Sequence, residues 1–273
     1  MSVQPIIQLD DIKVHFRSRT GPLLHPNIVK AVDGVSLTLM PGETIGIVGE
    51  SGCGKSTTAN VMCGLQKPTS GTVYFRGEDV TKRTAANRKK MGRVVSVVFQ
   101  DPSTALNARM VVRDQLKDPL NVHNVGDKEG RDAEVEELIS LVGLPHSALD
   151  ALPGQLSGGQ RQRVAIARAM IIEPDLVVLD EAVSALDVTV QAQILRLLDE
   201  LQRELELTYI FISHDLAVVN QISDTVSVLS HGTQVESGPT AQVFAHPETE
   251  YTRQLIDAIP GSRYRAGDLN LGL

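Results

Sequence analysis

Short apolar runs alternate with helix-compatible segments along most of this chain. The run Thr44–Val48 is nearly all apolar, and a glycine-rich loop and a helix-compatible segment, 55–65, follow it directly. A second run of the same kind occupies 176–179. Runs this short and this apolar are typical of strands that are buried on both faces of a parallel sheet. The alternation therefore predicts a mainly parallel α/β core.

The same pattern predicts the remaining elements and one interruption. Strands are expected at 6–16, 35–39, 71–76, 94–99, 208–213 and 226–229, and helices at 191–205, 216–221 and 252–258. A polar loop that runs to about Pro26 separates the first two strands. From 107 to about 171 the chain is polar, and apolar positions recur at helical spacing within 132–142. This stretch predicts a helical insert in the α/β core.

Composition narrows the class of protein. The 273 residues are 42% hydrophobic and carry a net charge of −7, and aromatic residues make up 3% without any Trp. An acidic chain so poor in aromatic side chains disfavours a nucleic-acid partner. The only cysteines, Cys53 and Cys63, are typical of a reducing compartment and exclude a cysteine-rich framework. We expect a cytosolic globular protein, because no apolar run reaches the ~18 residues of a membrane span and no signal peptide is evident.

A complete phosphate-binding motif follows the strand at 44–48. Gly49 to Ser56 reads Gly-Glu-Ser-Gly-Cys-Gly-Lys-Ser, which fills every fixed position of G-x-x-x-x-G-K-[ST]. In such a loop, backbone N–H groups and a helix N-terminus surround the phosphates. Lys55 would reach the β- and γ-phosphate oxygens, and Ser56 would bind Mg²⁺. A chance glycine turn is the alternative, and Cys53 has either an incidental or a redox role.

Two acids end the strand at 176–179. Asp180 and Glu181 would lie at the carboxyl edge of the sheet, where open α/β sheets place their active sites. Strand alternation would turn the two side chains opposite ways, so Asp180 could hold the metal while Glu181 polarises the attacking water. The alternative is a pair of acids that caps a helix N-terminus.

A second anion-binding motif lies at 156–160. Leu156-Ser-Gly-Gly-Gln160 precedes a helix-compatible stretch, so we expect Ser157 near the helix N-cap, with Gly158 and Gly159 exposing backbone N–H groups. One ATP needs only one phosphate loop. The motif is therefore either a plain helix cap or a site for a nucleotide that another subunit holds.

Together these motifs make the chain resemble the nucleotide-binding subunit of an ATP-binding-cassette transporter. The resemblance implies a P-loop NTPase (RecA-like) α/β fold with an N-terminal antiparallel β-subdomain and an inserted α-helical signature subdomain. We expect the ATP-binding core at 1–101 and 172–232, the signature subdomain at 102–171 and a C-terminal tail at 233–273.

The resemblance also implies roles for individual residues. Phe16 takes the position that stacks on adenine, unless it is an ordinary core residue. Gln100 matches a glutamine that contacts Mg²⁺ and water, unless it is an ordinary loop hydrogen bonder. Asp187 closes a segment that links two sites across a dimer, and His214 matches a histidine that contacts the γ-phosphate.

The residues expected to bind nucleotide are Phe16, Gly49, Glu50, Ser51, Gly52, Cys53, Gly54, Lys55, Ser56, Thr57, Gln100, Ser157, Gly158, Gly159, Gln160, Asp187 and His214. Those expected to act in hydrolysis are Glu181, His214, Gln100 and Lys55, and those expected to hold Mg²⁺ are Ser56, Gln100 and Asp180. The implied mechanism stacks two subunits head to tail, so that ATP binding closes the dimer and hydrolysis reopens it.

Several segments resemble the oligopeptide, dipeptide and nickel uptake branch of this family. They are 99–102, 106–110, 180–187 and the tail from Pro247 to Pro260, although Ala108 stands where that branch usually has Pro. The branch implies import of a solute, with peptides expected and nickel or another small solute as the alternative.

The branch also implies partners. They are a second ATPase subunit (a related heterodimer partner, or a copy of this chain), two transmembrane permease subunits that dock near 100–110 and the helical insert, and an extracytoplasmic solute-binding protein. The subunit would then lie peripherally on the cytoplasmic face of the cell membrane.

Two other classes of protein fit the sequence less well. Soluble cassette ATPases of translation or DNA maintenance typically carry tandem cassettes or long coiled coils, and this sequence shows neither. A regulatory nucleotide-binding module without turnover is disfavoured because Glu181 and His214 are both present.

Overall fold

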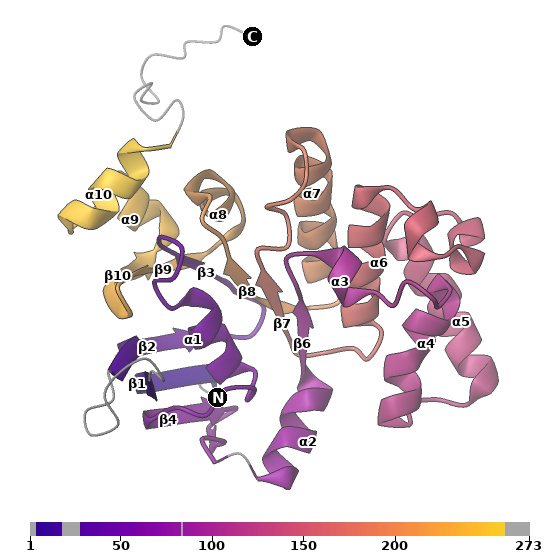
Figure 1. Cartoon of the computed structure of the whole chain (residues 1–273), viewed down its shortest axis with the longest axis horizontal. Helices are drawn as coiled ribbons and strands as arrows, with labels where there is room; N and C mark the ends of the chain where they lie inside the picture. Colours follow the sequence, from indigo (N-terminus) through magenta and orange to yellow (C-terminus); the bar gives the residue numbers. More distant parts are fainter. Residues whose placement is uncertain (1–3, 18–27, 83, 260–273) are drawn as a thin grey trace, which may run out of the picture.

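A computed structural model describes residues 4–17, 28–82 and 84–259. It contains two sheets (Figure 1). The antiparallel sheet has the strand order β2-β1-β4-β5, with β1 Ile7–Arg17, β2 Ile28–Leu39, β4 Ser70–Phe75 and β5 Glu78–Asp79. The larger sheet has the order β10-β9-β3-β8-β7-β6, with β3 Thr44–Val48, β6 Val95–Val98, β7 Leu176–Asp180, β8 Thr208–Ile212, β9 Thr225–Ser230 and β10 Thr233–Pro239.

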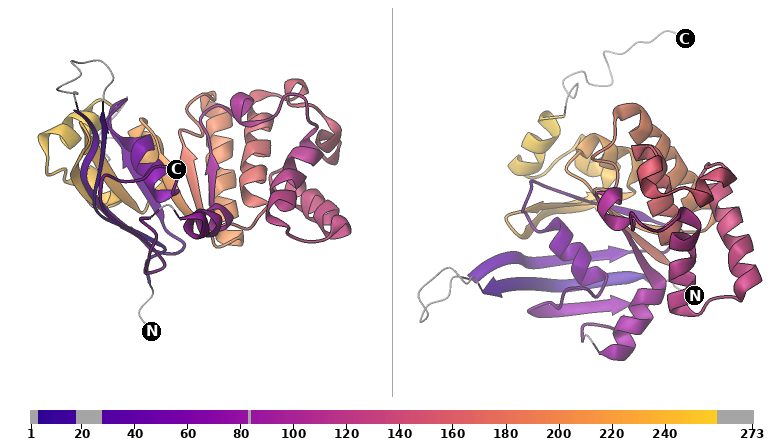
Figure 2. Two further views of the ribbon diagram at one scale, coloured as in Figure 1. Left: turned by 60° about the horizontal axis from the view of Figure 1, so that its bottom comes forward. Right: turned by 45° about the vertical axis from the view of Figure 1, so that its right-hand side comes forward.

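Helices cover these sheets and build a separate lobe. The helices of the core are α1 Lys55–Met62, α2 Ala85–Val94, α7 Val188–Glu204 and α8 Leu216–Ile222. The lobe contains α3 Pro102–Ala105, α4 Val112–His123, α5 Lys128–Leu141 and α6 Gly158–Met170, with 3-10 turns at His146–Asp150 and Pro153–Gln155. The C-terminal helices are α9 Thr240–Ala245 and α10 Glu250–Asp257. Both views of Figure 2 place the antiparallel sheet at one side of the molecule and α4 and α5 at the other.

Strand β8 shows why the larger sheet is buried. Tyr209 and Phe211 pack in one hydrophobic cluster with α6 and α7, while Ile210 and Ile212 pack in a second cluster with α1 and the antiparallel sheet. All four side chains are fully buried. Because successive strand residues face opposite sides, a strand covered on both faces is mostly apolar along its length. The parallel strands of the larger sheet and the separate antiparallel sheet confirm the predicted α/β fold.

The structure also contains elements that the sequence pattern did not predict. Helix α2 buries only Met91, so its sequence shows little amphipathic periodicity. Strand β10 ends in Gly238 and Pro239, which are typical of a turn. It is nevertheless the edge strand of its sheet, where a proline need not donate a ladder hydrogen bond. Strand β2 begins at Ile28 and not at the predicted residue 35. The predicted loop that runs to Pro26 and the last part of the predicted tail, from Pro260 on, lie outside the described residues.

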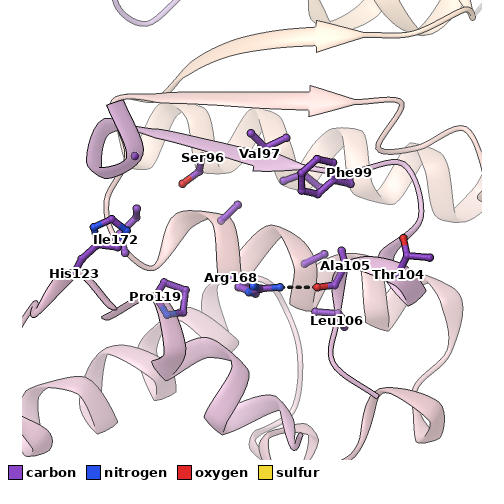
Figure 3. Close-up of a pocket in the computed structure, with 14 residues that line it drawn as sticks. Ser96, Val97, Phe99, Thr104, Ala105, Leu106, Pro119, His123, Arg168 and Ile172 are labelled. Carbon is purple, nitrogen blue, oxygen red and sulfur yellow. Dashed lines mark hydrogen bonds between the residues drawn. The ribbon is translucent and has the colours of Figure 1, made fainter. Parts of the chain in front are cut away.

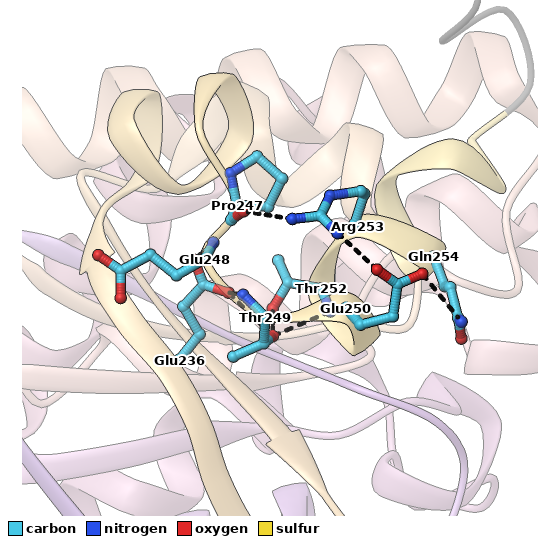
Figure 4. Close-up of polar contacts among 8 residues, drawn as sticks. All are labelled: Glu236, Pro247, Glu248, Thr249, Glu250, Thr252, Arg253 and Gln254. Atoms are coloured by element: carbon cyan, nitrogen blue, oxygen red, sulfur yellow. Dashed lines mark hydrogen bonds and ion pairs between the residues drawn. The ribbon is translucent and has the colours of Figure 1, made fainter.

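The C-terminal helices are fastened to β10 through the carboxylate of Glu236 (Figure 4). This side chain is 8% exposed. It accepts hydrogen bonds from the backbone N–H groups of Glu248 (2.8 Å) and Thr249 (3.1 Å) and from the Thr249 hydroxyl (3.0 Å). Thr249 in turn caps α10, because its hydroxyl accepts from the N–H of Thr252 at 3.2 Å. Helix α10 therefore starts at a fixed point on the larger sheet.

The Glu236 carboxylate should make the stability of this attachment depend on pH. Burial raises its pKa, but the hydrogen bonds from Thr252, Glu248 and Thr249 outweigh burial and leave the pKa below its usual value of 4.5. The stabilisation is therefore present above pH 4.5 and is lost as the pH falls through the lower folded-state pKa. We predict that Glu236→Gln lowers the urea midpoint at neutral pH and that its difference from wild type narrows in acid. The exposed Glu248→Gln is the control, and a difference that stays constant with pH would contradict the prediction.

Candidate nucleotide-binding site

The site forms where four parallel strands end side by side. Strands β3, β8, β7 and β6 are parallel neighbours in that order. Directly after their last residues come Gly49, Ser213, Glu181 and Phe99, respectively. Open α/β sheets bind ligands outside the carboxyl ends of their strands, because the loops that start there converge.

Two glycines allow the phosphate loop to touch backbone from other elements. A Cβ at Gly49 would lie 2.1 Å from the carbonyl oxygen of Leu229, and Gly49 has φ 145°. A Cβ at Gly54 would lie 2.3 Å from the carbonyl oxygen of Ala31, and Gly54 has φ 108°. Only glycine fits both the space and these angles without strain. The loop is thus held between β2 and β9.

Lys55 is held inside the loop by carbonyl groups. Its side chain is buried, at 5% exposed. The ammonium donates to the carbonyl oxygens of Gly49 at 2.8 Å and Glu50 at 2.9 Å. Both partners are neutral, so the full positive charge stays available to a phosphate.

A cavity of about 360 Å³ opens over the loop. Its lining residues are Ala31, Ser51, Gly52, Gly54, Lys55, Ser56, Thr57, Gln100, Asp180 and Glu181. The structure therefore brings together most of the predicted phosphate-site and hydrolysis residues. Phe16 lies outside this lining, on β1 opposite Val29, with its residue 43% exposed.

Ser56 and Asp180 form a hydroxyl–carboxylate pair at the base of the cavity. The Ser56 hydroxyl donates to Asp180 Oδ1 at 3.2 Å. Burial raises the pKa of Asp180 and the charge of Glu181 adds to this, while the Ser56 hydrogen bond and the Lys55 charge oppose it. A hard divalent cation favours such oxygen ligands and would stabilise the charged carboxylate. The residues present therefore fit Mg²⁺.

Glu181 is placed by a turn and not by strand alternation. Strand β7 ends at Asp180, and Glu181 has φ 50°, an uncommon left-handed conformation for a residue with a side chain. Its N–H donates to the carbonyl of Ile212 at 3.0 Å, which fixes the turn to β8. Both acids line the same cavity, so the expectation that they face opposite ways is wrong. Strained backbone of this kind is typical of functional sites.

Two polar side chains lie next to the turn. His214 Nδ1 is 3.5 Å from Glu181 Oε1. Gln100 Nε2 is 3.5 Å from the hydroxyl of Ser184, which itself donates to the carbonyl of Glu181 at 2.9 Å. The loops after β6, β7 and β8 are therefore joined through the residues around Glu181.

The 156–160 motif forms a helix cap outside this cavity. Ser157 is the N-cap of α6: its hydroxyl accepts from the N–H of Gln160 at 3.2 Å, and Gln160 Oε1 accepts from the Ser157 N–H at 2.8 Å. This capping box confirms the predicted N-cap. A Cβ at Gly159 would lie 2.7 Å from the Val190 side chain, which packs α6 against the start of α7, where Asp187 is the N-cap. The capped helix end supports anion binding, but none of its residues lines the cavity over Lys55.

Comparison with known proteins identifies the family. The ABC transporter family model matches residues 32–184, which is more than half of the chain. The chain belongs to the ABC transporter family. It is 46% identical to the oligopeptide transport ATP-binding protein AppF of Bacillus subtilis over 96% of this chain and 80% of AppF. It is 43% identical to the dipeptide transport ATP-binding protein DppF of Escherichia coli over 94% of this chain and 77% of DppF.

Solved structures agree with this assignment. The ATP-binding cassette MJ0796, in a dimeric post-hydrolysis state bound to ADP and phosphate, matches with a TM-score of 0.75 and 28% identity over 86% of this chain and 98% of that one. The cbiO1 protein of Clostridium perfringens, part of an ABC transporter complex, matches with a TM-score of 0.77 and 28% identity over 94% of this chain and 96% of that one. The chain is therefore an ATP-binding, ATP-hydrolysing subunit of this family. No helix of the described part is both long and apolar enough to cross a membrane.

Two contacts at the site could not be predicted from the sequence. The carbonyl of Ala31 lies against Gly54, and the Tyr251 hydroxyl accepts from the Glu50 N–H at 3.3 Å. Ala31 has no distinctive side chain, and Tyr251 lies in the C-terminal tail, so no local pattern points to either residue.

The packing of Gly54 against Ala31 leads to a prediction for ATP binding. We expect Gly54→Ala to weaken ATP affinity about tenfold or more, because the new methyl group meets a backbone oxygen and alanine is strained at this φ. Equilibrium binding of a fluorescent ATP analogue measures the effect. Gly154→Ala is the control, because a Cβ at that position meets nothing within 4 Å. Equal affinities of the two variants would contradict the explanation.

Proposed function

We propose that this chain is the ATPase that powers import of peptides through an ABC transporter. One observation supports ATP hydrolysis by this chain: a single cavity at the strand ends is lined by Lys55, Ser56, Asp180 and Glu181. The peptide cargo is supported by the relatives, several of which are peptide transport ATP-binding proteins. Nickel or another small solute is the alternative cargo.

Glu181 is the general base in this proposal. Its carboxylate lines the cavity near Lys55 and would accept a proton from the water that attacks the γ-phosphorus. His214, beside Glu181, would donate to a γ-phosphate oxygen, and Gln100 would orient the water. Lys55 would stabilise the charge that builds on the phosphate oxygens.

Ser56 and Asp180 would hold Mg²⁺, with Gln100 reaching the same ion from the loop after β6. When bound, the ion neutralises charge on the β- and γ-phosphates. The 3.2 Å contact between the Ser56 hydroxyl and Asp180 supports this assignment, because it already places two oxygen ligands at one point.

The signature helix cap would bind the nucleotide of a second ATPase subunit. Within this chain, Ser157 to Gln160 lie outside the cavity over Lys55. The capping box uses the N–H groups of Ser157 and Gln160, so the N–H groups of Gly158 and Gly159, at the N-terminus of α6, are the ones that suit a phosphate. Two cassettes stacked head to tail would place the signature cap of each chain over the γ-phosphate of the ATP bound to the other chain. Asp187, at the start of α7, would lie at the same interface. We expect a related but distinct partner subunit, with a copy of this chain as the alternative.

A second cavity, of about 430 Å³, is the proposed dock for a transmembrane subunit (Figure 3). It lies between β6, α3, α4 and α6, and Phe99, Pro119 and Ile172 give it an apolar wall. Arg168 crosses its floor and donates to the carbonyl of Ala105 at 2.6 Å. Phe99 is 48% exposed and directly precedes Gln100, so a segment seated here would contact the loop that enters the ATP cavity.

The remaining partners follow from this role. Two permease subunits would carry the cargo across the membrane, an extracytoplasmic solute-binding protein would deliver it, and this subunit would lie on the cytoplasmic face. Reconstitution of the chain with these partners in vesicles tests the function: ATP-dependent uptake of labelled peptide supports it, and uptake of nickel alone would reassign the cargo.

Removal of the general base should separate ATP binding from hydrolysis. We predict that Glu181→Gln lowers steady-state hydrolysis about 100-fold or more and traps ATP with the closed dimer, because the amide cannot accept the proton. Phosphate release and size-exclusion chromatography with ATP measure the two effects. Glu137→Gln, on the exposed face of α5, is the control. Near-normal turnover of Glu181→Gln would refute its role.

A bulky residue in the signature cap should block closure. We predict that Ser157→Arg leaves ATP binding to this chain unchanged but abolishes ATP-driven association with the partner ATPase, because the side chain fills the space for the partner's γ-phosphate. Ser157→Ala removes the cap bond without adding bulk and separates helix destabilisation, about 1 kcal/mol, from obstruction. Association of Ser157→Arg at the wild-type level would rule out the shared site.

A further inference from the structure

The C-terminal part of the chain touches the phosphate loop at three points. The carbonyl of Leu229 lies against Gly49, and the N–H of Gly232 donates to the carbonyl of Cys53 at 3.0 Å. The Tyr251 hydroxyl accepts a hydrogen bond from the N–H of Glu50 at 3.3 Å. The first two contacts come from β9 and the turn after it, whereas the third comes from Tyr251 in α10, 201 residues after Glu50.

The Tyr251 contact acts on the peptide unit that also holds Lys55. The peptide group between Gly49 and Glu50 contains the N–H that donates to Tyr251 and the carbonyl oxygen that accepts from Lys55 at 2.8 Å. The two bonds therefore run through one planar group. Donation from the N–H polarises the carbonyl and strengthens its attraction for the ammonium. Rotation of this peptide would move the carbonyl away from Lys55.

Tyr251 is well suited to hold that peptide in place. Its ring is half-buried and packs against the hydrophobic cluster of the core. The N-cap of its helix is Thr249, which the buried Glu236 carboxylate ties to β10 (Figure 4). The hydroxyl is thus presented from a rigid element and not from a loose tail, so little entropy is lost when the bond forms.

We propose that Tyr251 is a positioning residue for ATP binding: its hydroxyl fixes the Gly49–Glu50 peptide and, through it, the ammonium of Lys55. The C-terminal helix α10 then becomes part of the nucleotide site without touching the nucleotide. The coupling is reciprocal: if docking of α10 favours ATP binding, ATP binding must favour the docked state of α10 to the same extent.

The test uses Tyr251→Phe in the purified full chain, because phenylalanine keeps the ring and removes only the hydroxyl. Loss of one hydrogen bond that orders the site is expected to raise the Kd and KM for ATP about 2- to 10-fold, with kcat changed less than about twofold. ATP should also slow hydrogen exchange in 250–257 of the wild type and do so less in the variant. Tyr209→Phe is the matched control: it loses a tyrosine hydroxyl bond to a backbone carbonyl, that of Leu198 at 3.1 Å, far along β8 from the strand end that faces ATP.

The inference rests on ATP binding at the Lys55 loop, and its failure can be told apart from failure of that site. If wild type and both variants bind ATP equally and only their unfolding midpoints differ, Tyr251 is merely structural and the proposal falls. If Tyr251→Phe weakens ATP binding and Tyr209→Phe does not, the proposal stands. Absence of ATP binding in the wild type would overturn the nucleotide site itself.

Discussion

Close backbone packing around the phosphate loop is the constraint on which the rest of the site depends. Gly49 and Gly54 lie against the carbonyl oxygens of Leu229 and Ala31, which belong to different sheets. Because the loop is held from both sides, its own carbonyls can turn inward and hold the buried Lys55 ammonium. The antiparallel sheet therefore helps to shape the phosphate loop, since β2 forms one wall of it. The same packing explains why both glycines need conformations that other residues rarely adopt.

In the proposed mechanism, one chain does not complete the site. The cavity over Lys55 contains the groups to which we assign charge neutralisation and activation of water, but the signature cap at Ser157 lies elsewhere. A helix N-terminus that exposes N–H groups attracts an anion, and in the proposed dimer the partner's γ-phosphate would be that anion. In this account the γ-phosphate charge joins the two cassettes, and its loss on hydrolysis removes the attraction. Separation of the two cassettes would then move a permease segment that is seated beside Phe99.

The phosphate-loop motif and the buried strands can be predicted from the sequence, whereas the geometry around them cannot. The motif from Gly49 to Ser56 and the apolar strands on each side of the sheet follow from local pattern, because glycine, lysine and buried strands have short-range requirements. The direction of Glu181 did not follow, since a left-handed turn and not strand alternation sets it. Strand β10 was hidden by Gly238 and Pro239, which an edge strand tolerates. The contact of Tyr251 with Glu50 depends on how the whole chain folds back, and no local signal encodes it.

The central claim is that each ATP is bound by residues of two chains. The most direct measurement is a structure of the assembled transporter with ATP bound under conditions that prevent hydrolysis. It would show which residues contact the γ-phosphate of each ATP. The account predicts that the signature serine of the opposing ATPase lies within hydrogen-bond distance, about 3 Å, of the γ-phosphate held over each phosphate loop, and that Ser157 of this chain contacts the partner's nucleotide. A γ-phosphate contacted by the residues of a single chain, with Ser157 facing solvent, would contradict it.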